Sequence, residues 1–424
     1  MKADLIIRSD CIVTCREDAK TGNAGRDAGI ISGYIAVAGG RIMEVGEGDI
    51  PGKYSGAELN FLDARGRTVI PGLIDSHTHL IHGGSRESEL SLKLKGVPYL
   101  EILKAGGGIL STVRSTRQAA REELKAKAKK SLDQMLLHGT TTVEAKSGYG
   151  LDLETEARCL EAAAELDREH PVDIVRTYMG AHAIPEEYKG NPKGYMDFMT
   201  GVVMPYVAEN RLAEFMDVFC EEGVFSPQES RELMEKGRKA GFKLKIHADE
   251  IIPLGGAELA AEMGAVSAEH LLAASDSGLD ALGRAKTTAV LLPGTSFYLM
   301  LGRYADARRM IEKGIRVALA TDYNPGTCPT ENLQTVMTFA CFGMKLTPGE
   351  IIRGMTINAA YAVDRASEIG SVEAGKRADL VILDTPNLDY AVYHFGINHV
   401  HRVIKNGKTV VEDGRITDAK GKKA

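Results

Sequence analysis

The 424 residues of this chain carry a formal net charge of −6, with 44% hydrophobic residues, 26% charged residues and no tryptophan. An acidic balance of this kind disfavours nucleic acid or an anionic membrane surface as the main partner. No apolar run approaches the ~20 residues that a membrane-spanning helix needs. The chain is longer than one ordinary hydrophobic core requires, so we expect one large domain and one smaller domain.

The N-terminal sequence has an early acid, Asp4, and lacks the pattern of a secretory signal. Six cysteines are scattered along the chain, which is typical of a protein in a reducing compartment. We therefore expect a cytoplasmic protein.

Short β-rich runs separated by glycine and aspartate occupy both ends of the chain. Near the N-terminus they are Leu5–Ile7, Cys11–Val13, Tyr34–Val37 and Arg41–Val45, and near the C-terminus they are Ala378–Leu383 and Val400–Lys408. Because the two sets are alike, we predict that residues 1–67 and 366–424 together build one small β-sandwich domain.

The middle of the chain, residues 68–365, alternates short apolar runs with helical patterns, which is typical of βα units around a parallel sheet. The runs predict strands at Val69–Asp75, Thr140–Ala145, Asp173–Gly180, Phe215–Glu221, Phe242–His247, Ala265–His270, Thr287–Leu292 and Ile315–Thr321. Eight such units in about 290 residues fit an α/β fold of the (β/α)8 TIM-like barrel type. A doubly wound sheet is the alternative.

Several helix starts are indicated by Ser or Thr followed three residues later by Glu or Gln. We expect capping boxes at Ser226–Glu229 and Thr347–Glu350, each with proline at the first helical position. A third box, Ser115–Gln118, precedes an apolar stripe from Ala120 to Leu136 that recurs every four residues and predicts a buried helix face.

The first predicted barrel strand is followed by His77 and His79, which are two residues apart. On a strand such residues point to the same face, so both rings can converge on one metal ion. Neutral imidazole is a good ligand for zinc and for iron. The pair alone is also compatible with two polar residues at a strand end.

Reactive side chains fall at the ends of other predicted strands as well. In a barrel these ends meet at the face that carries the active site. Five of the 11 histidines lie there together with two carboxylates: His77, His79, His182, His247, His270, Glu250 and Asp322. The pattern favours a catalytic site over histidines scattered through a core.

We therefore predict a mononuclear metal site formed by His77, His79, His247 and Asp322, with a water in the open position. Asp322 would also take the proton of that water and return it to a leaving nitrogen. His270 could be a ligand, or it could orient the attacking hydroxide or polarise a substrate carbonyl. Lys146 invites a carbamylated bridge between two metals, but we expect it to form an ion pair or hydrogen bond in the barrel mouth.

With these residues in place, the chain resembles the amidohydrolase superfamily over essentially its whole length. The segments Pro71–His79 and Gly375–Leu380 are typical of the superfamily in general. More specific segments resemble the members that open an imidazolone ring in histidine degradation, and these are His82–Glu87, Ala105–Ile109, Glu144–Gly150, Gly180–Pro185, His247–Glu250 and Ala320–Gly326.

The resemblance implies hydrolysis of 4-imidazolone-5-propanoate to N-formimidoyl-L-glutamate, with one zinc or iron ion per chain. It implies the same four ligands, and around the substrate it implies Arg86, Tyr149, His182, Glu250, Asn324, Gly326 and Thr327. Two positions depart slightly from the family pattern, because Tyr323 stands where phenylalanine is expected and Thr327 where serine is also usual. Related proteins often pair, so we expect a homodimer, to which Met and Cys side chains of a helix at Leu333–Met344 could contribute.

Two of these positions point independently to an acidic substrate. A guanidinium such as that of Arg86 grips a carboxylate through two parallel hydrogen bonds, and Tyr149 can donate its phenol to the same group. A nucleobase deaminase of the same superfamily, acting on a neutral ring, would not need them. An inactive amidohydrolase-like scaffold would have lost metal ligands, and a metal-storage or sensing module would not explain the polar surroundings.

Overall fold

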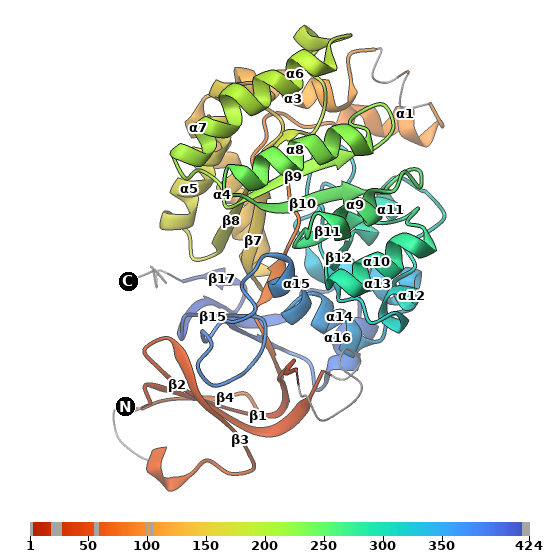
Figure 1. Cartoon of the computed structure of the whole chain (residues 1–424). Coiled ribbons are helices and arrows are strands. Elements are labelled where there is room, and N and C mark those ends of the chain that lie inside the picture. The colour runs from red at the N-terminus through yellow and green to blue at the C-terminus, as the bar shows by residue number, and fades with distance from the viewer. Residues whose placement is uncertain (1–2, 18–27, 55–58, 98–100, 102–104, 418–424) are drawn as a thin grey trace.

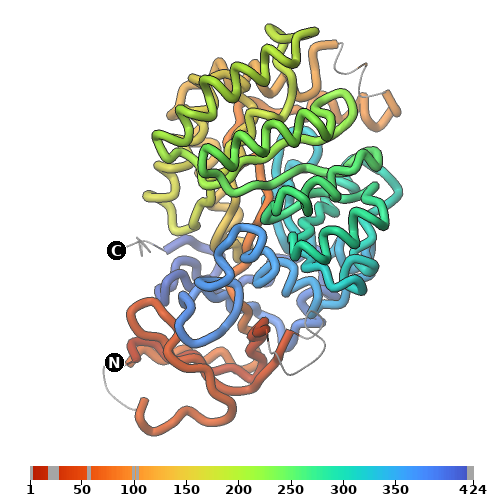
Figure 2. The backbone as a smooth tube through the Cα atoms, in the orientation of Figure 1, coloured from red at the N-terminus to blue at the C-terminus, as the bar shows by residue number. Residues whose placement is uncertain are grey.

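The computed structural model describes residues 3–17, 28–54, 59–97, 101 and 105–417. They form a barrel surrounded by helices and a separate mixed sheet to which both ends of the chain contribute (Figure 1). The backbone trace shows the red N-terminal and blue C-terminal segments side by side below the barrel (Figure 2).

Within the described residues the barrel consists of eight parallel strands in the order β13-β12-β11-β10-β9-β8-β7-β6. Their bounds are β6 Leu73–Asp75, β7 Thr140–Lys146, β8 Asp173–Ala181, β9 Phe215–Cys220, β10 Lys243–Ala248, β11 Ser267–His270, β12 Thr288–Leu291 and β13 Val317–Leu319. Beyond the last and first strands, Thr78 and Tyr323 form a parallel bridge that joins the two edges at the barrel mouth. The predicted barrel and its chain order are confirmed.

The helices of the barrel region follow the strands in sequence and cover the outside of the barrel (Figure 1). They are α1 Leu90–Leu94, α3 Gly108–Gln118, α4 Arg121–Leu137, α5 Leu153–Glu169, α6 Pro192–Phe198, α7 Met204–Glu209, α8 Pro227–Lys239, α9 Gly256–Glu262, α10 Asp276–Ala285, α11 Pro293–Tyr298, α12 Ala307–Glu312, α13 Leu333–Met344, α14 Pro348–Gly354 and α15 Ile357–Ala362.

Two of the three predicted capping boxes are confirmed. Ser226 and Glu229 cap α8, and Thr347 and Glu350 cap α14, in each case with proline in the first turn. The prediction at Ser115 and Gln118 is wrong, because both residues lie inside α3, which begins earlier at Gly108. The apolar stripe that follows is nevertheless buried on α4 from Leu124 onward.

The run Val69–Asp75, predicted as one strand, is divided at Gly72 between two sheets. β5, Thr68–Pro71, pairs with strands from the chain ends, while β6 begins the barrel. A side chain at position 72 would lie 2.3 Å from Thr141 Oγ1, so only glycine allows this close passage from one sheet to the other. Because both halves are fully buried, the run is apolar on both sides of Gly72, and its hydrophobic pattern does not reveal the break.

The second sheet has nine strands among the described residues, in the order β17-β16-β15-β14-β5-β1-β2-β3, with β4 also paired to β1. The strands are β1 Leu5–Val13, β2 Ile30–Ala38, β3 Arg41–Glu47, β4 Asn60–Asp63, β14 Leu380–Leu383, β15 Val400–Lys405, β16 Lys408–Glu412 and β17 Arg415–Ile416, together with β5. Antiparallel pairing of β14 with β5 joins the C-terminal strands to the N-terminal ones. A short helix, α16 Leu388–Tyr393, connects β14 and β15.

A buried ion-pair cluster fastens this sheet to the barrel. Lys405 at the end of β15 is fully buried, and its Nζ lies 2.8 Å from Asp173 Oδ2 and 2.6 Å from Asp379 Oδ2. Asp173 begins barrel strand β8, and it also accepts from Arg377 Nη1 at 2.6 Å. A cation from the sheet therefore pairs with a carboxylate of the barrel in a region that solvent does not reach.

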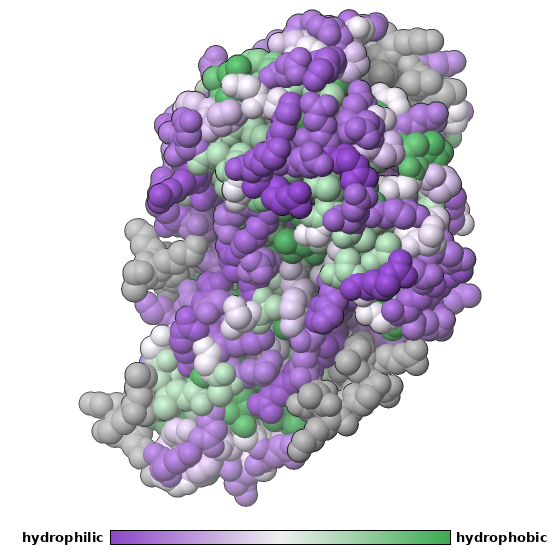
Figure 3. All heavy atoms as spheres, viewed as in Figure 1, coloured by the Kyte–Doolittle hydropathy of each residue, from purple (hydrophilic) through white to green (hydrophobic). Residues whose placement is uncertain are grey.

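The face of the molecule in Figure 3 is predominantly hydrophilic, with hydrophobic side chains in separate patches. Within the described part of the chain, the helices are too short or too polar to cross a bilayer.

We expect Lys405→Met to destabilise the protein by about 3–5 kcal/mol, because it removes the buried cation that Asp379 and Asp173 share and leaves only Arg377 paired with Asp173. The midpoint of chemical unfolding, followed by circular dichroism, measures the change. Lys408→Met, an exposed lysine on the adjacent strand β16, is the matched control. An unfolding midpoint for Lys405→Met equal to that of the control would contradict the role of the cluster.

Candidate metal centre and active site

Three histidines converge at the mouth of the barrel. His77 and His79 follow β6, and His247 lies near the end of β10. All three are buried, and one ligand nitrogen from each lies within 4.8 Å of the others. Asp322, just after β13, adds a carboxylate whose Oδ1 is 3.5 Å from His77 Nε2 and 3.8 Å from His79 Nε2. The structure thus brings together the four predicted ligands.

The donor set fits a divalent metal ion. Among the described residues, the buried Nε2 atoms of His77 and His247 have no hydrogen-bond partner. Burial lowers the pKa of His77 and His79 well below the usual range, which keeps both rings neutral, as metal ligands must be. Unpaired buried nitrogens are costly, and coordination of a cation would satisfy them.

Two carboxylates that the sequence analysis did not single out fix the orientation of these rings. His77 Nδ1 donates to Glu269 Oε2 at 2.7 Å, and His247 Nδ1 donates to Asp217 Oδ1 at 3.1 Å. Because Nδ1 carries the proton in each case, Nε2 presents its lone pair to the centre of the cluster. Glu269 on β11 and Asp217 on β9 lie immediately behind the ligands.

A lysine completes this layer. Lys146 at the end of β7 is buried, and its Nζ lies 2.7 Å from Asp217 Oδ2 and 2.9 Å from Glu144 Oε2. Although burial alone would lower the pKa of Lys146, the charges of Asp217 and Glu144 raise it above its ordinary value. Lys146 is therefore a charged partner of Asp217, which agrees with the ion pair expected from the sequence.

Asp322 is held in a specific and strained position. Its backbone adopts the left-handed region with φ of 55°, and its Oδ2 accepts from the Thr295 hydroxyl at 2.6 Å. That contact leaves Oδ1 directed at the histidines. Burial raises the pKa of Asp322 to about 6. A carboxyl group with such a pKa is suited to exchanging a proton near neutral pH.

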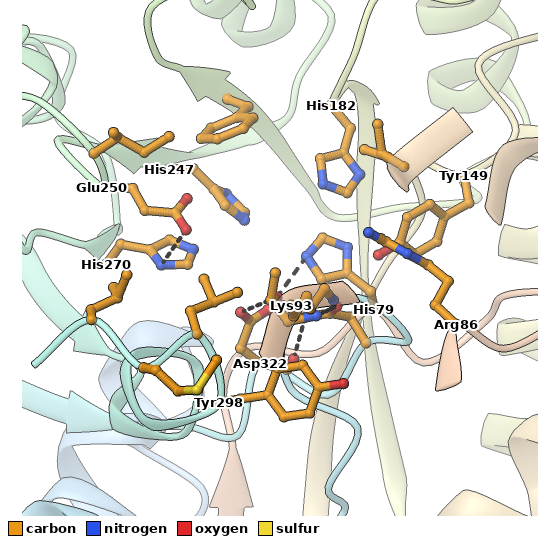
Figure 4. Close-up of a pocket in the computed structure, with 18 of the residues that line it drawn as sticks. His79, Arg86, Lys93, Tyr149, His182, His247, Glu250, His270, Tyr298 and Asp322 are labelled. Atoms are coloured by element: carbon orange, nitrogen blue, oxygen red, sulfur yellow. Dashed lines mark hydrogen bonds and ion pairs between the residues drawn. The ribbon is translucent and has the colours of Figure 1, made fainter. Parts of the chain in front are cut away.

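A cavity of about 510 Å³ opens onto this cluster (Figure 4). Most of the predicted site residues line it, namely His79, Arg86, Tyr149, His182, His247, Glu250, His270, Asp322, Asn324 and Thr327. His77 is fully buried beneath, and Gly326 backs onto Arg86. Lys93 and Tyr298, which also line the cavity, were not predicted.

Arg86 and Tyr149 stand on one side of the cavity in Figure 4, opposite Glu250 and His270. Arg86 is 6% exposed, and its Nε and Nη2 both donate to Glu89, each at 2.9 Å. Tyr149 belongs to a loop whose backbone N–H groups, at Gly148, Gly150 and Leu151, donate to the buried carboxylate of Glu156. The two residues are thus held rigidly before any ligand arrives.

Glu250 and His270, on the side of the cavity opposite Arg86, have shifted pKa values that favour their uncharged forms. Burial, aided by the charge of Asp322, raises the pKa of Glu250 to about 8. His270, with φ of 70°, has its Nδ1 3.6 Å from Glu250 Oε1, and burial lowers its pKa well below the usual range. Its ring centroid lies 5.1 Å from that of His247. His270 therefore lies beside the cluster of His77, His79 and His247 as an uncharged polar group.

His182 stacks on His79 with the ring centroids 4.7 Å apart. Its Nδ1 contacts Gly148 O at 3.0 Å, and because a carbonyl only accepts, Nδ1 must carry the proton. Burial lowers the pKa of His182 to about 3, so the ring is neutral and its Nε2 is an acceptor.

The loop after Asp322 is shaped by Asn324. The side-chain Oδ1 accepts from the backbone N–H groups of Gly326 and Thr327 at 2.8 and 2.7 Å, and Nδ2 donates to Asp322 O at 2.7 Å. A Cβ at position 326 would lie 2.1 Å from Arg86 Nη1, so glycine is required for Arg86 to approach the loop. Asn324 therefore stabilises the loop that carries the carboxylate ligand.

Comparison with known proteins shows the family to which the chain belongs. The model of the Amidohydrolase family matches residues 68–410. The imidazolonepropionase of Alkaliphilus oremlandii is 59% identical over 399 residues, covering 94% of each chain. That of Treponema denticola is 60% identical over 385 residues, covering 91% of this chain and 93% of its own. The chain therefore belongs to the amidohydrolase family and, within it, to the imidazolonepropionases.

Solved structures share the fold at low sequence identity. A variant of atrazine chlorohydrolase from Arthrobacter aurescens, complexed with zinc and atraton, has a TM-score of 0.72 at 17% identity, covering 98% of this chain and 97% of its own. A 5-methylcytosine deaminase from Klebsiella pneumoniae has a TM-score of 0.71 at 17% identity, covering 98% and 99%. The family and the fold together make the chain a metal-dependent hydrolase that acts on C–N bonds.

We expect Glu269→Gln to weaken metal binding by about 10- to 100-fold, because the carboxylate that orients His77 loses its charge. Dialysis against graded concentrations of a chelator, followed by elemental analysis, measures the metal retained. Glu258→Gln, on α9 and hydrogen-bonded to Ser275 rather than to a ligand, is the control. If both variants retain metal equally, Glu269 does not support the site.

Proposed function

We propose that this site hydrolyses the ring C–N bond of 4-imidazolone-5-propanoate and yields N-formimidoyl-L-glutamate, a step in histidine degradation. The main support for the proposal is that the residues of the metal site and the cation Arg86 share one cavity. His79, His247 and Asp322 line it together with Arg86. Identity of 59–60% with imidazolonepropionases over nearly the full length supports the same reaction.

We propose that His77, His79, His247 and Asp322 hold one zinc or iron ion. Such an ion supplies Lewis acidity, which lowers the pKa of water and polarises a carbonyl. Imidazole and carboxylate ligands suit both metals, so the donor set supports either choice.

Asp322 is the proposed proton carrier. With Oδ2 bound to Thr295, Oδ1 faces the reaction centre and accepts the proton of the attacking water. The same oxygen then donates this proton to the ring nitrogen as the C–N bond breaks. Neutral His270 is proposed to orient the water or to donate to the substrate carbonyl as negative charge develops on its oxygen.

The remaining polar groups are proposed to hold the substrate. Arg86 and Tyr149 are proposed to bind the propanoate tail, because they offer a cationic and a phenolic donor in the same cavity. Glu250 and the acceptor Nε2 of His182 suit the N–H groups of the ring. Asn324 and Thr327, in the loop after Asp322, line the same cavity.

Purified protein should consume the imidazolone chromophore, with formimidoylglutamate identified by mass. Asp322→Asn should lower turnover by at least about 100-fold, because the carrier of the proton is lost. Substrate incubated without enzyme is the baseline, since the substrate decays unaided. Near-normal turnover by Asp322→Asn would refute the role of Asp322, and decay no faster than this baseline in the unsubstituted enzyme would refute the substrate.

We expect elemental analysis of the purified protein to give one zinc or iron ion per chain. A chelator should remove this ion, and activity should be lost with it. Restoring each metal separately to the stripped protein identifies the one that supports turnover. Two ions per chain would contradict the mononuclear site, in which Lys146 is engaged with Asp217 and Glu144 rather than with metal.

We further propose a homodimer in the cytoplasm. Phe342 on α13 is 62% exposed, Tyr393 at the end of α16 is 77% exposed, and Phe395 just beyond that helix is 60% exposed. Phe342 and Phe395 contact each other with ring centroids 5.9 Å apart, so they form a continuous aromatic surface of the kind that subunits cover. All six cysteines, which lie in the described residues, are free thiols, as a reducing compartment would keep them.

Phe342→Glu should convert the dimer into a monomer, because a charge cannot be buried cheaply in an apolar interface. Sedimentation velocity measures the oligomeric state. Phe61→Glu, on the exposed strand β4, is a control with similar exposure that should leave the dimer intact. A monomeric unsubstituted protein, or a dimeric Phe342→Glu variant, would contradict this interface.

A further inference from the structure

The cavity wall beside Arg86 carries more positive than negative charge. Arg86, Glu89 and Lys93 form one cluster, with side chains 7%, 6% and 11% exposed. Glu89 contacts both cations, at 2.9 Å from Arg86 Nη2 and 3.4 Å from Lys93 Nζ. One carboxylate thus faces two cations in a nearly dry part of the cavity, which favours the binding of a further anion.

Only part of the Arg86 guanidinium is available to a ligand. Its Nε and Nη2 hydrogen-bond the two oxygens of Glu89 in parallel, which is the geometry that a substrate carboxylate would otherwise adopt. The guanidinium therefore cannot use this edge for the propanoate tail while the pair with Glu89 holds. A second cation would therefore strengthen the grip that Arg86 and Tyr149 are proposed to provide.

Lys93 is positioned to be that donor. It lies on α1, four residues after Glu89, and lines the cavity together with Arg86 (Figure 4). Its Nζ donates to Gly326 O at 2.7 Å and lies 5.2 Å from the centre of the Tyr298 ring. Burial and the nearby Arg86 lower the pKa of Lys93, and the charge of a bound carboxylate would reverse this effect.

We propose that Lys93 is a specificity-determining residue that binds the carboxylate tail of the substrate together with Arg86. The inference rests on the proposed function and adds to it the residue that makes the cavity select an acidic over a neutral side chain. An ammonium group has three donors, so Lys93 can keep its bond to Gly326 and still donate to the ligand. Tyr298 limits the movement of the ammonium group by a cation–π contact.

A purely structural role for Lys93 makes a different prediction. The bond to Gly326 O ties α1 to the loop that begins at Asp322. If this tether were the whole role, its loss would disturb ligands with and without a negative charge alike. Comparison of a charged ligand with a neutral one of the same shape therefore separates the two roles.

The experiment uses Lys93→Met, Lys93→Arg and the control Lys95→Met, an exposed lysine on the same segment. Calorimetry measures binding of imidazole propanoate, an unreactive ring with the acidic tail, and of the corresponding neutral propanamide. Lys93→Met should bind the acid about 10- to 100-fold more weakly, because a charge-assisted hydrogen bond is lost. It should bind the amide as the unsubstituted enzyme does, and Lys93→Arg should retain most of the affinity for the acid.

Turnover of imidazolone propanoate provides the second measurement. Lys93→Met should raise KM by a similar factor with little change in kcat, because the lost contact lies away from the breaking bond. Unchanged affinity for the acid, or an equal loss for acid and amide, would overturn the inference. Failure of the proposed function would show separately, as absence of turnover by the unsubstituted enzyme, and the calorimetric test of Lys93 would still stand.

Discussion

The structure depends on a layer of buried ion pairs beneath the histidines. Lys146 neutralises Asp217 and Glu144, and Asp217 in turn orients His247. Burial of several charges is costly unless each is paired and hydrogen-bonded, and here strands β7, β9 and β10 supply the partners. Because β9 and β10 are neighbours and only β8 separates them from β7, one rigid barrel directs the imidazole nitrogens at one point before a metal arrives.

The loops above these ion pairs hold Asp322 and His270 at the mouth of the barrel. Asp322 and His270 both have positive φ, a conformation that costs free energy in residues other than glycine. The Thr295 and Asn324 hydrogen bonds help to hold Asp322 and its loop in place. The rigid barrel thus supports strained loops, and the strain falls on Asp322 and His270, the two residues proposed to act on the substrate.

The charge of the cavity wall supports the proposed choice of substrate. Solved neighbours with similar architecture include a chlorohydrolase and a deaminase of heterocycles, at 17% identity. In this chain Arg86 and Lys93 lie on the wall of the cavity, with Glu89 paired to both. An acidic tail would complete the charge balance, whereas a neutral ring would leave a buried excess of positive charge.

The sequence alone determined the strand order of the barrel, the shared sheet of the two chain ends and the cluster His77, His79 and His247. Those features are encoded locally, in apolar runs and in the residues that directly follow them. Only the tertiary structure decided the break at Gly72, the support of His77 by Glu269 and the place of Lys93 beside Arg86. Each of these depends on which strand or loop lies next to which across the barrel, and no local periodicity in the sequence carries that information.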